Sequence, residues 1–158
     1  MEYKTNVMRI LDKAGVQYIP HTYVNTGATS GAEAAAAMGK DPALVFKTLV
    51  TVGKSKKNYV FVIPVLEELD LKRAAAAVGE KSIEMIKQKE LLPLTGYIHG
   101  GCSPIGMKKI FKTTLHESAR ELDTITFSAG KIGYQVEMSA DTLKKIIEFD
   151  FADIIVKK

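Results

Sequence analysis

The run Val45-Phe46-Lys47-Thr48-Leu49-Val50-Thr51-Val52 is followed, after a short charged segment, by Tyr59-Val60-Phe61-Val62-Ile63-Pro64. Both runs are rich in β-branched and aromatic residues, which are typical of strands. The segment between them, Lys54-Ser55-Lys56-Lys57-Asn58, has the polar composition of a turn. The two runs are therefore predicted to form a β-hairpin, and the more apolar second run is predicted to be a buried strand.

Helix and strand signals alternate on both sides of this hairpin. Thr5, Ser30 and Asp70 each stand where a side-chain oxygen can cap the start of a helix. Helices are thus expected at 6–14, 34–38 and 71–78, with a last one starting near Ser139. Further strands are expected at 16–23, 82–85, 110–115, 124–128, 134–138 and 152–156, and ahead of the loop at 100–106. This order predicts an α+β fold with a mixed, curved sheet and several surrounding helices.

Length and composition are those of an ordinary globular chain. The 158 residues, 46% hydrophobic and 25% charged, predict one domain over 1–158. A net charge of +4 permits a polyanionic partner without requiring one. The start of the chain lacks a secretory pattern, and no apolar run approaches the roughly 20 residues of a membrane span. A lone cysteine allows no internal disulfide, so a cytoplasmic location is expected.

Lys47 is the most unusual residue of the first run. Strand alternation places it on the face of Leu49 and Thr51, opposite Phe46 and Thr48. One interpretation is a lysine that points to solvent. The other is an ammonium held beside a phosphate or an ester carbonyl. The residues alone leave both interpretations open.

The loop Gly100-Gly101-Cys102-Ser103-Pro104-Ile105-Gly106 could be a structural turn or a binding loop. Its glycines permit tight turns and close approach of a ligand to the backbone amides, which can bind an anion. It is not a Walker loop, because the Gly-Lys-Ser/Thr ending is absent. Cys102 could be a nucleophile or a small apolar residue, and the spacing to His99 does not place the imidazole on the thiol.

Few other residues are candidates for a metal site or for binding a ligand. His21, His99 and His116 have no metal-ligand spacing, so neither a metal nor another cofactor is expected. The basic residues beside the glycine loop, at 108, 109 and 112, form either a solvated strand or a rim that guides phosphates.

Taken together, several segments resemble the YbaK/EbsC family of aminoacyl-tRNA deacylases, which is related to the editing domain of prolyl-tRNA synthetase. The resemblance covers nearly the whole chain and is most specific at 95–109. The other matching segments are His21-Thr22-Tyr23, Val45-Phe46-Lys47-Thr48-Leu49, Asp70-Leu71-Lys72-Arg73, Val78-Gly79, Glu84-Met85, Ser128-Ala129-Gly130-Lys131 and Phe151-Ala152-Asp153-Ile154. The family fold implied is a barrel-like mixed sheet with surrounding helices.

The resemblance also implies a set of site residues. Lys47 corresponds to the hallmark lysine of the family, and Gly101 and Ser103 are expected to complete the catalytic group. The implied substrate-binding residues are Tyr23, Thr48, Gly100, Cys102, Pro104, Ser128 and Gln135. Two of them depart from the family, which often has an aliphatic residue at position 102 and an aspartate at position 135.

The activity implied is removal of cysteine from mischarged Cys-tRNA(Pro), with the substrate thiol attacking its own ester. Lys47 would hold the terminal adenosine or polarise the ester, and the amides of 101–103 would stabilise the oxyanion. Alternatives are hydrolysis of Ala-tRNA(Pro) by water, a non-catalytic tRNA- or nucleotide-binding module, and a regulatory protein. Aminoacyl-tRNA is the expected partner, prolyl-tRNA synthetase is a second candidate, and neither a membrane nor DNA is expected.

Overall fold

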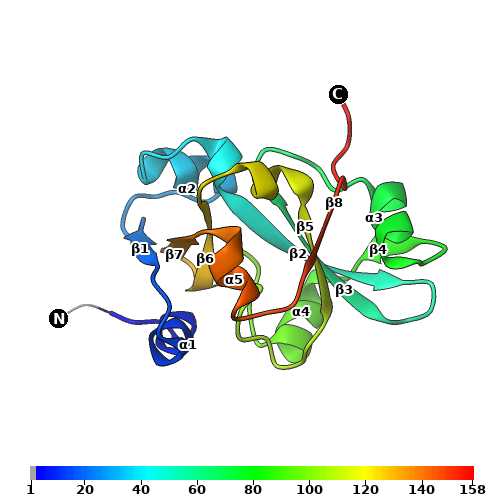
Figure 1. Cartoon of the computed structure of the whole chain (residues 1–158), viewed down its shortest axis with the longest axis horizontal. Helices are drawn as coiled ribbons and strands as arrows, with labels where there is room; N and C mark the ends of the chain where they lie inside the picture. Colours follow the sequence, from blue (N-terminus) through cyan, green and yellow to red (C-terminus); the bar gives the residue numbers. More distant parts are fainter. Residues whose placement is uncertain (1–2) are drawn as a thin grey trace.

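The computed structural model describes residues 3–158 of the chain, and Figure 1 shows the arrangement of its elements. The helices are α1 (Asn6–Ala14), α2 (Gly31–Ala37), α3 (Leu71–Val78), α4 (Gln88–Thr95) and α5 (Ala140–Lys144), with two 3-10 turns, η1 (Pro42–Leu44) and η2 (Glu117–Glu121). The strands are β1 (Ile19–Thr22), β2 (Phe46–Gly53), β3 (Asn58–Pro64), β4 (Ile83–Met85), β5 (Lys112–His116), β6 (Ile125–Lys131), β7 (Tyr134–Met138) and β8 (Asp150–Ala152).

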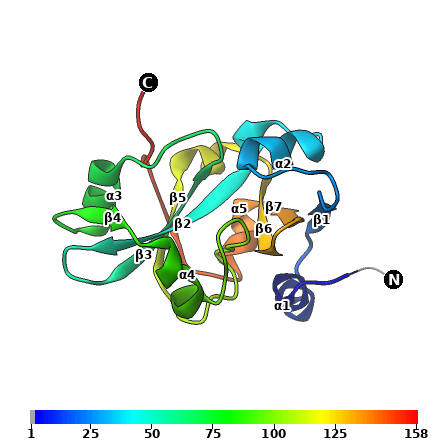
Figure 2. The same cartoon turned by 180° about the vertical axis from the view of Figure 1, so that it is seen from behind.

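The strands form two open sheets. A five-stranded mixed sheet has the order β4-β2-β3-β5-β8, and a three-stranded antiparallel sheet has the order β1-β7-β6. A single parallel bridge between Val45 and Thr126 links them. Figures 1 and 2 place the three-stranded sheet and α1 at one end of the molecule and α3 with β4 at the other. The predicted α+β class and mixed sheet are confirmed, and the sheets do not close into a barrel.

The predicted hairpin is present, and it is buried on both faces. Strands β2 and β3 pair antiparallel, with Lys47 opposite Ile63. Phe46 and Val50 on one face join the main core, whereas Phe61 and Ile63 belong to a second core under α3. Burial of each such side chain contributes about 1.5–3 kcal/mol. This two-sided burial explains the nearly continuous apolar run of β3.

The predicted helix caps are confirmed in detail. The hydroxyl of Thr5 accepts from Met8 N–H at 3.2 Å, and the carboxylate of Asp70 accepts from two amides of α3. The hydroxyl of Ser30 accepts from the amide of Glu33, but the Glu33 carboxylate bonds Thr29 rather than closing a capping box on Ser30. Local capping chemistry thus determines where three of the helices begin.

Three expectations are wrong in their position or kind of element. The glycine loop follows helix α4, not a strand, because the Glu90 carboxylate accepts from Lys87 N–H and starts a helical turn there. The last strand is Asp150–Ala152, and beyond it Ile155 forms only an isolated bridge with Leu69. The strand expected at 16–23 is shorter, Ile19–Thr22, and it is an edge strand, where Pro20 is tolerated.

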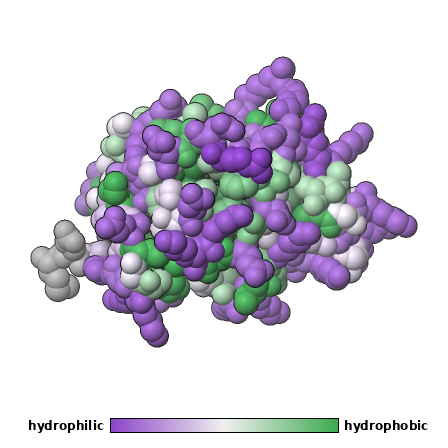
Figure 3. Space-filling model, in the orientation of Figure 1, coloured by the Kyte–Doolittle hydropathy of each residue, from purple (hydrophilic) through white to green (hydrophobic). Residues whose placement is uncertain are grey.

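The face of the molecule drawn in Figure 3 is mostly polar. Hydrophilic side chains cover most of the face in Figure 3, and the apolar patches between them are small and separate. Within residues 3–158, no helix has the length and apolarity needed to cross a membrane. The expectation about the N-terminal targeting pattern includes Met1 and Glu2, which lie outside the described residues.

Candidate functional site

Strand pairing brings two of the predicted site residues together. Ser128 of β6 lies opposite Gln135 of β7, and Gln135 in turn lies opposite His21 of β1. Residues that are directly opposite in an antiparallel pair share a face, so the three side chains leave the same side of this sheet. Phe127 and Val136, which alternate with them, are buried in the main core on the other side.

The bridge between the sheets adds Lys47 to this face. Val45 pairs with Thr126 in parallel, so two residues further along each chain Lys47 and Ser128 leave on the same side. Thr48, which was expected to bind substrate beside Lys47, instead leaves β2 on the opposite side, the side on which Phe46 joins the main core. We call the surface formed by Lys47, Ser128 and Gln135 the lysine face.

The positive charge of Lys47 is only partly offset by nearby carboxylates. Its side chain is half-buried, and this burial lowers its pKa, while the charges of Glu68 and Glu67 oppose the shift. None of the ion pairs within residues 3–158 includes Lys47. A partly desolvated cation without a close counter-ion is suited to bind an anion or to polarise a carbonyl.

Polar atoms on the lysine face lack protein partners. Within residues 3–158, Oε1 of Gln135 and Oγ1 of Thr126 are buried and accept no hydrogen bond. Buried polar atoms without a partner are uncommon and need an explanation. Because both atoms are buried, a ligand at this face would contact them only after a local rearrangement of the neighbouring groups.

The glycine loop packs against the turn of the β6–β7 hairpin. A Cβ atom on Gly101 would lie 3.2 Å from the backbone nitrogen of Ile132 and 3.4 Å from backbone atoms of Lys131. Only glycine fits this approach without displacing the turn. Gly100, with φ 89°, reverses the chain just before the contact. Glycine therefore keeps the loop close to the hairpin that carries Ser128 and Gln135.

Two adjacent amides of the loop, within residues 3–158, have no hydrogen-bond partner. Gly101 N–H donates to the Ile98 carbonyl at 3.0 Å, and Ile105 N–H donates to Oγ of Ser103 at 3.3 Å. Within residues 3–158, no hydrogen bond uses the N–H groups of Cys102 and Ser103. Of the three amides expected to bind an anion, Gly101 is thus already paired, and only the two successive amides of 102 and 103 are unpaired.

The side chains of the loop are packed rather than exposed. Ser103 is fully buried, Pro104 is also buried, and Cys102 is 8% exposed. Burial raises the pKa of the Cys102 thiol to about 12, against the smaller lowering effect of a hydrogen bond with Thr95. A thiol that stays protonated at neutral pH is a poor nucleophile.

Tyr23 lies at the same hairpin turn. Its N–H donates to the Gly133 carbonyl at 2.8 Å, and its own carbonyl accepts from the Thr26 hydroxyl at 2.6 Å. The side chain is 9% exposed. The hairpin turn thus contacts both the segment after β1 and the glycine loop.

Comparisons with known proteins show the family of the chain. Residues 25–146 match the family described as the aminoacyl-tRNA editing domain. A protein of Enterococcus faecalis (strain ATCC 700802 / V583), named "Putative Cys-tRNA(Pro)/Cys-tRNA(Cys) deacylase EbsC", is 42% identical over 99% of this chain and 96% of its own. The chain belongs to the aminoacyl-tRNA editing domain family.

Solved structures show the same fold. The crystal structure of "a putative trans-editing enzyme for prolyl tRNA synthetase" superposes with a TM-score of 0.82 at 22% identity, covering 98% of this chain and all of the other. A hypothetical protein superposes with a TM-score of 0.84 at 20% identity, covering 96% of this chain and all of its own. At these low sequence identities, the superpositions show that the chains share a fold.

One cluster of this editing domain was missed by sequence reasoning. The Glu137 carboxylate contacts Nε2 of His21 at 2.7 Å, Nζ of Lys40 at 2.7 Å and the Thr124 hydroxyl at 2.6 Å. Burial would raise the pKa of Glu137, but the hydrogen bonds from Lys40, Thr124 and His21 outweigh it and lower the pKa to about 2. Alternation along β7 could have placed Glu137 on the face of Gln135.

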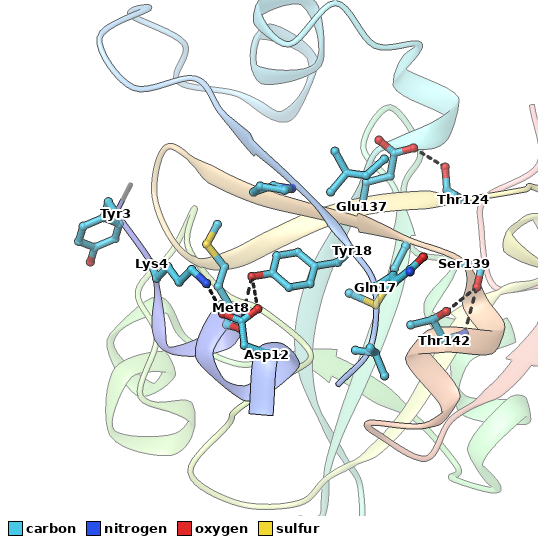
Figure 4. Close-up of a pocket in the computed structure, with 14 residues that line it drawn as sticks. Tyr3, Lys4, Met8, Asp12, Gln17, Tyr18, Thr124, Glu137, Ser139 and Thr142 are labelled. Carbon is cyan, nitrogen blue, oxygen red and sulfur yellow. Dashed lines mark hydrogen bonds and ion pairs between the residues drawn. The ribbon is translucent and has the colours of Figure 1, made fainter. Parts of the chain in front are cut away.

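A hollow of about 660 Å³ lies beside this cluster, between α1, β1 and the start of α5. Figure 4 shows Tyr18 pointing toward Asp12 within it, and Glu137 with Thr124 at its far side. None of the predicted site residues lines this hollow. Lys47 lies on the lysine face instead, and the loop with the unpaired amides packs against the turn of the hairpin that carries Ser128 and Gln135.

Among residues 3–158, no group of three or more His, Cys, Asp or Glu side chains is placed to hold a metal ion.

Proposed function

We propose that the chain is a deacylase that removes cysteine from Cys-tRNA(Pro), with the lysine face and the amides of 102–103 as its active site. The observation that carries the proposal is the half-buried ammonium of Lys47, which shares a face with Ser128 and Gln135 beside the loop with free amides. The relative in Enterococcus faecalis, which is named as acting on Cys-tRNA, supports the choice of cysteine.

The proposed chemistry needs no nucleophile from the protein. The thiol of the bound cysteinyl group attacks its own ester carbonyl, so a carbon–sulfur bond forms and the carbon–oxygen bond to the ribose breaks. The thiol proton ends on the ribose oxygen, which leaves a free tRNA end and a small thiolactone. Because the attack is intramolecular, orientation supplies much of the acceleration. The buried, protonated thiol of Cys102 agrees with this absence of covalent catalysis.

Each site residue has a role in the proposal. The amides of Cys102 and Ser103 donate to the oxyanion that develops on the carbonyl, and Lys47 holds the terminal adenosine end or polarises the ester. Gly101 keeps the loop against the hairpin, Gly100 turns the chain, and buried Pro104 stiffens it.

Three of the remaining residues border the proposed site, and one supports it from the core side. Ser128 and Gln135 contact the aminoacyl group from the lysine face, with the Gln135 amide in place of a carboxylate. Tyr23 borders the pocket at the hairpin turn. Thr48 supports β2 from the core side, opposite Lys47.

The test is deacylation of Cys-tRNA(Pro), Cys-tRNA(Cys) and Ala-tRNA(Pro) by the wild type and by Lys47→Ala, Cys102→Ala and Lys81→Ala. Lys81 is exposed on the far end of the molecule and serves as the matched control. We expect the wild type to release cysteine. Lys47→Ala should lower kcat/KM by at least about 100-fold, because it removes a group that stabilises developing negative charge. Cys102→Ala and Lys81→Ala should keep most of the activity.

Each other outcome contradicts part of the proposal. Release of alanine but not cysteine would indicate hydrolysis by water, and tRNA binding without turnover would indicate a binding module. Full activity in Lys47→Ala would remove Lys47 from the mechanism. Loss of activity in Cys102→Ala alone would indicate covalent catalysis.

The proposal extends to a cytoplasmic setting and to prolyl-tRNA synthetase as the source of the substrate. Cysteine and proline are similar in size, and a binding pocket discriminates such molecules by only about 1–3 kcal/mol. In a mixture of synthetase, cysteine, ATP and tRNA(Pro), Cys-tRNA(Pro) should accumulate without this protein and not with it. Accumulation at the same rate in both would contradict the extension.

A further inference from the structure

A second, smaller hollow of about 420 Å³ borders the end of the glycine loop at Gly106. Three segments that are distant in sequence form it: the start of α1, the end of α4 with the loop that follows, and the β6–β7 turn. Its lining includes the cations Lys4, Arg9, Lys108 and Lys131, and among residues 3–158 it includes no acidic side chain.

Three of these four charges are uncompensated. Lys4 is neutralised by Asp12, at 2.5 Å. No ion pair within residues 3–158 involves Arg9, Lys108 or Lys131. Lys131 donates to the neutral hydroxyl of Tyr3 and lies 4.6 Å from the centre of its ring, which leaves its charge available. Cations from three segments that converge without a carboxylate are suited to a polyanion.

The backbone holds one of these cations in place. Lys108 N–H donates to the Thr95 carbonyl at 3.0 Å. Its aliphatic stem lies over Gly96, where an added Cβ atom would be 3.3 Å from Cγ of Lys108. The backbone and the stem of Lys108 therefore start from an ordered position, which reduces the entropy lost when its ammonium binds a phosphate.

The hollow adjoins the proposed active site through one layer of backbone. Backbone atoms of Lys131 lie against Gly101, while its side chain lines the hollow. Tyr97 lines the hollow too, and its hydroxyl donates to the Ile105 carbonyl of the same loop at 2.5 Å. A tRNA phosphate bound in the hollow would thus be separated by only a short length of RNA from an ester bound at the amides of 102–103.

We propose that this hollow binds a backbone phosphate of the tRNA near its aminoacylated 3′ end. The inference rests on the proposed function, since it assigns a second contact to the same substrate. Arg9, Lys108 and Lys131 hold the phosphate by charge, without reading the base sequence. The contact positions the ester at the lysine face and makes activity on tRNA dependent on salt concentration.

The test compares two substrates with the double variant Arg9→Gln/Lys108→Gln, with Lys81→Gln as the control for a lysine outside the hollow. One substrate is full Cys-tRNA(Pro), and the other is the cysteinyl ester of adenosine, which has no backbone phosphate. With tRNA we expect kcat/KM of the double variant to fall about 10-fold at low salt. The slope of log kcat/KM against log salt should become shallower by about 1 per lost charge.

With the adenosine ester, the double variant should match the wild type, because no phosphate is present. Equal kcat/KM and equal salt slopes on tRNA for the double variant, Lys81→Gln and the wild type would overturn the phosphate site. An equal loss on both substrates would overturn it too, since that pattern indicates damage to the active site. Absence of wild-type activity on Cys-tRNA(Pro) itself would instead contradict the proposed function.

Discussion

At the scale of single residues, burial separates the lysine from the cysteine. Lys47 is half-buried and keeps an ammonium that no close ion pair neutralises within residues 3–158. Cys102 is almost fully buried, and its pKa is raised to about 12. Sequence alone left both side chains open to two interpretations, because exposure and charge compensation depend on neighbours from other segments.

Cys102 should be unreactive in the folded protein. With a thiol pKa of about 12 and 8% exposure, we expect alkylation by iodoacetamide at pH 8 to be at least about 100-fold slower than for free cysteine. Alkylation in concentrated guanidinium chloride should proceed at the ordinary rate and serves as the control. Rapid modification of the native protein would contradict the packed environment of the loop.

At the scale of elements, the contact between the glycine loop and the β6–β7 hairpin organises the site. The hairpin contributes Ser128 and Gln135, and the loop contributes the amides of 102 and 103. Helix α4, which precedes the loop, was not predicted, because Pro93 and a weak apolar pattern obscure it. The strand pattern of β6 and β7 was plain, so the hairpin could be predicted and its contact with the loop could not.

Gly101→Ala tests this contact. The added methyl group would lie 3.2 Å from the nitrogen of Ile132, so the loop must move away from the hairpin by a few tenths of an ångström. We expect a loss of about 1 kcal/mol in the free energy of unfolding, as for a mildly overpacked site. The loss in kcat/KM should be larger, about 10-fold or more, because the amides shift relative to the ester.

Urea unfolding and deacylation of Cys-tRNA(Pro) measure the two effects. Gly27→Ala is a control for glycine replacement itself, since a Cβ atom there meets nothing within 4 Å and φ is already strained at 80°. It should lower stability without a comparable fall in kcat/KM. Unchanged activity in Gly101→Ala would show that the loop position does not matter for turnover.

At the scale of the whole molecule, Glu137 ties distant segments together. Its carboxylate joins β7 to His21 of β1, to Lys40 after α2 and to Thr124 before β6. These contacts fix the segment between β1 and β2 against the three-stranded sheet. That segment carries Tyr23 at the edge of the proposed pocket.

This cluster predicts a loss of stability in acid. The pKa of the Glu137 carboxyl falls from an ordinary value of 4.5 to about 2 in the folded protein, so the stabilisation is complete above about pH 5 and is lost as the pH falls toward 2. The shift corresponds to a contribution on the order of 3 kcal/mol at neutral pH. Urea unfolding between acidic and neutral pH should show this decline in the wild type and a flatter profile in Glu137→Gln. Parallel profiles for the two proteins would contradict the assignment.

Local patterns were enough to predict the hairpin of β2 and β3, the capped helices and the face of Lys47, because capping chemistry and strand alternation act over a few residues. The family of the chain was also recognisable from motifs such as 95–109. Only the tertiary structure decided that the Val45–Thr126 bridge brings Lys47 beside Ser128, and that the amides of 102 and 103 stay free. It also brought Arg9, Lys108 and Lys131 to one hollow. The physical reason is that periodicity shows which way a side chain points, whereas packing between distant segments determines what it meets.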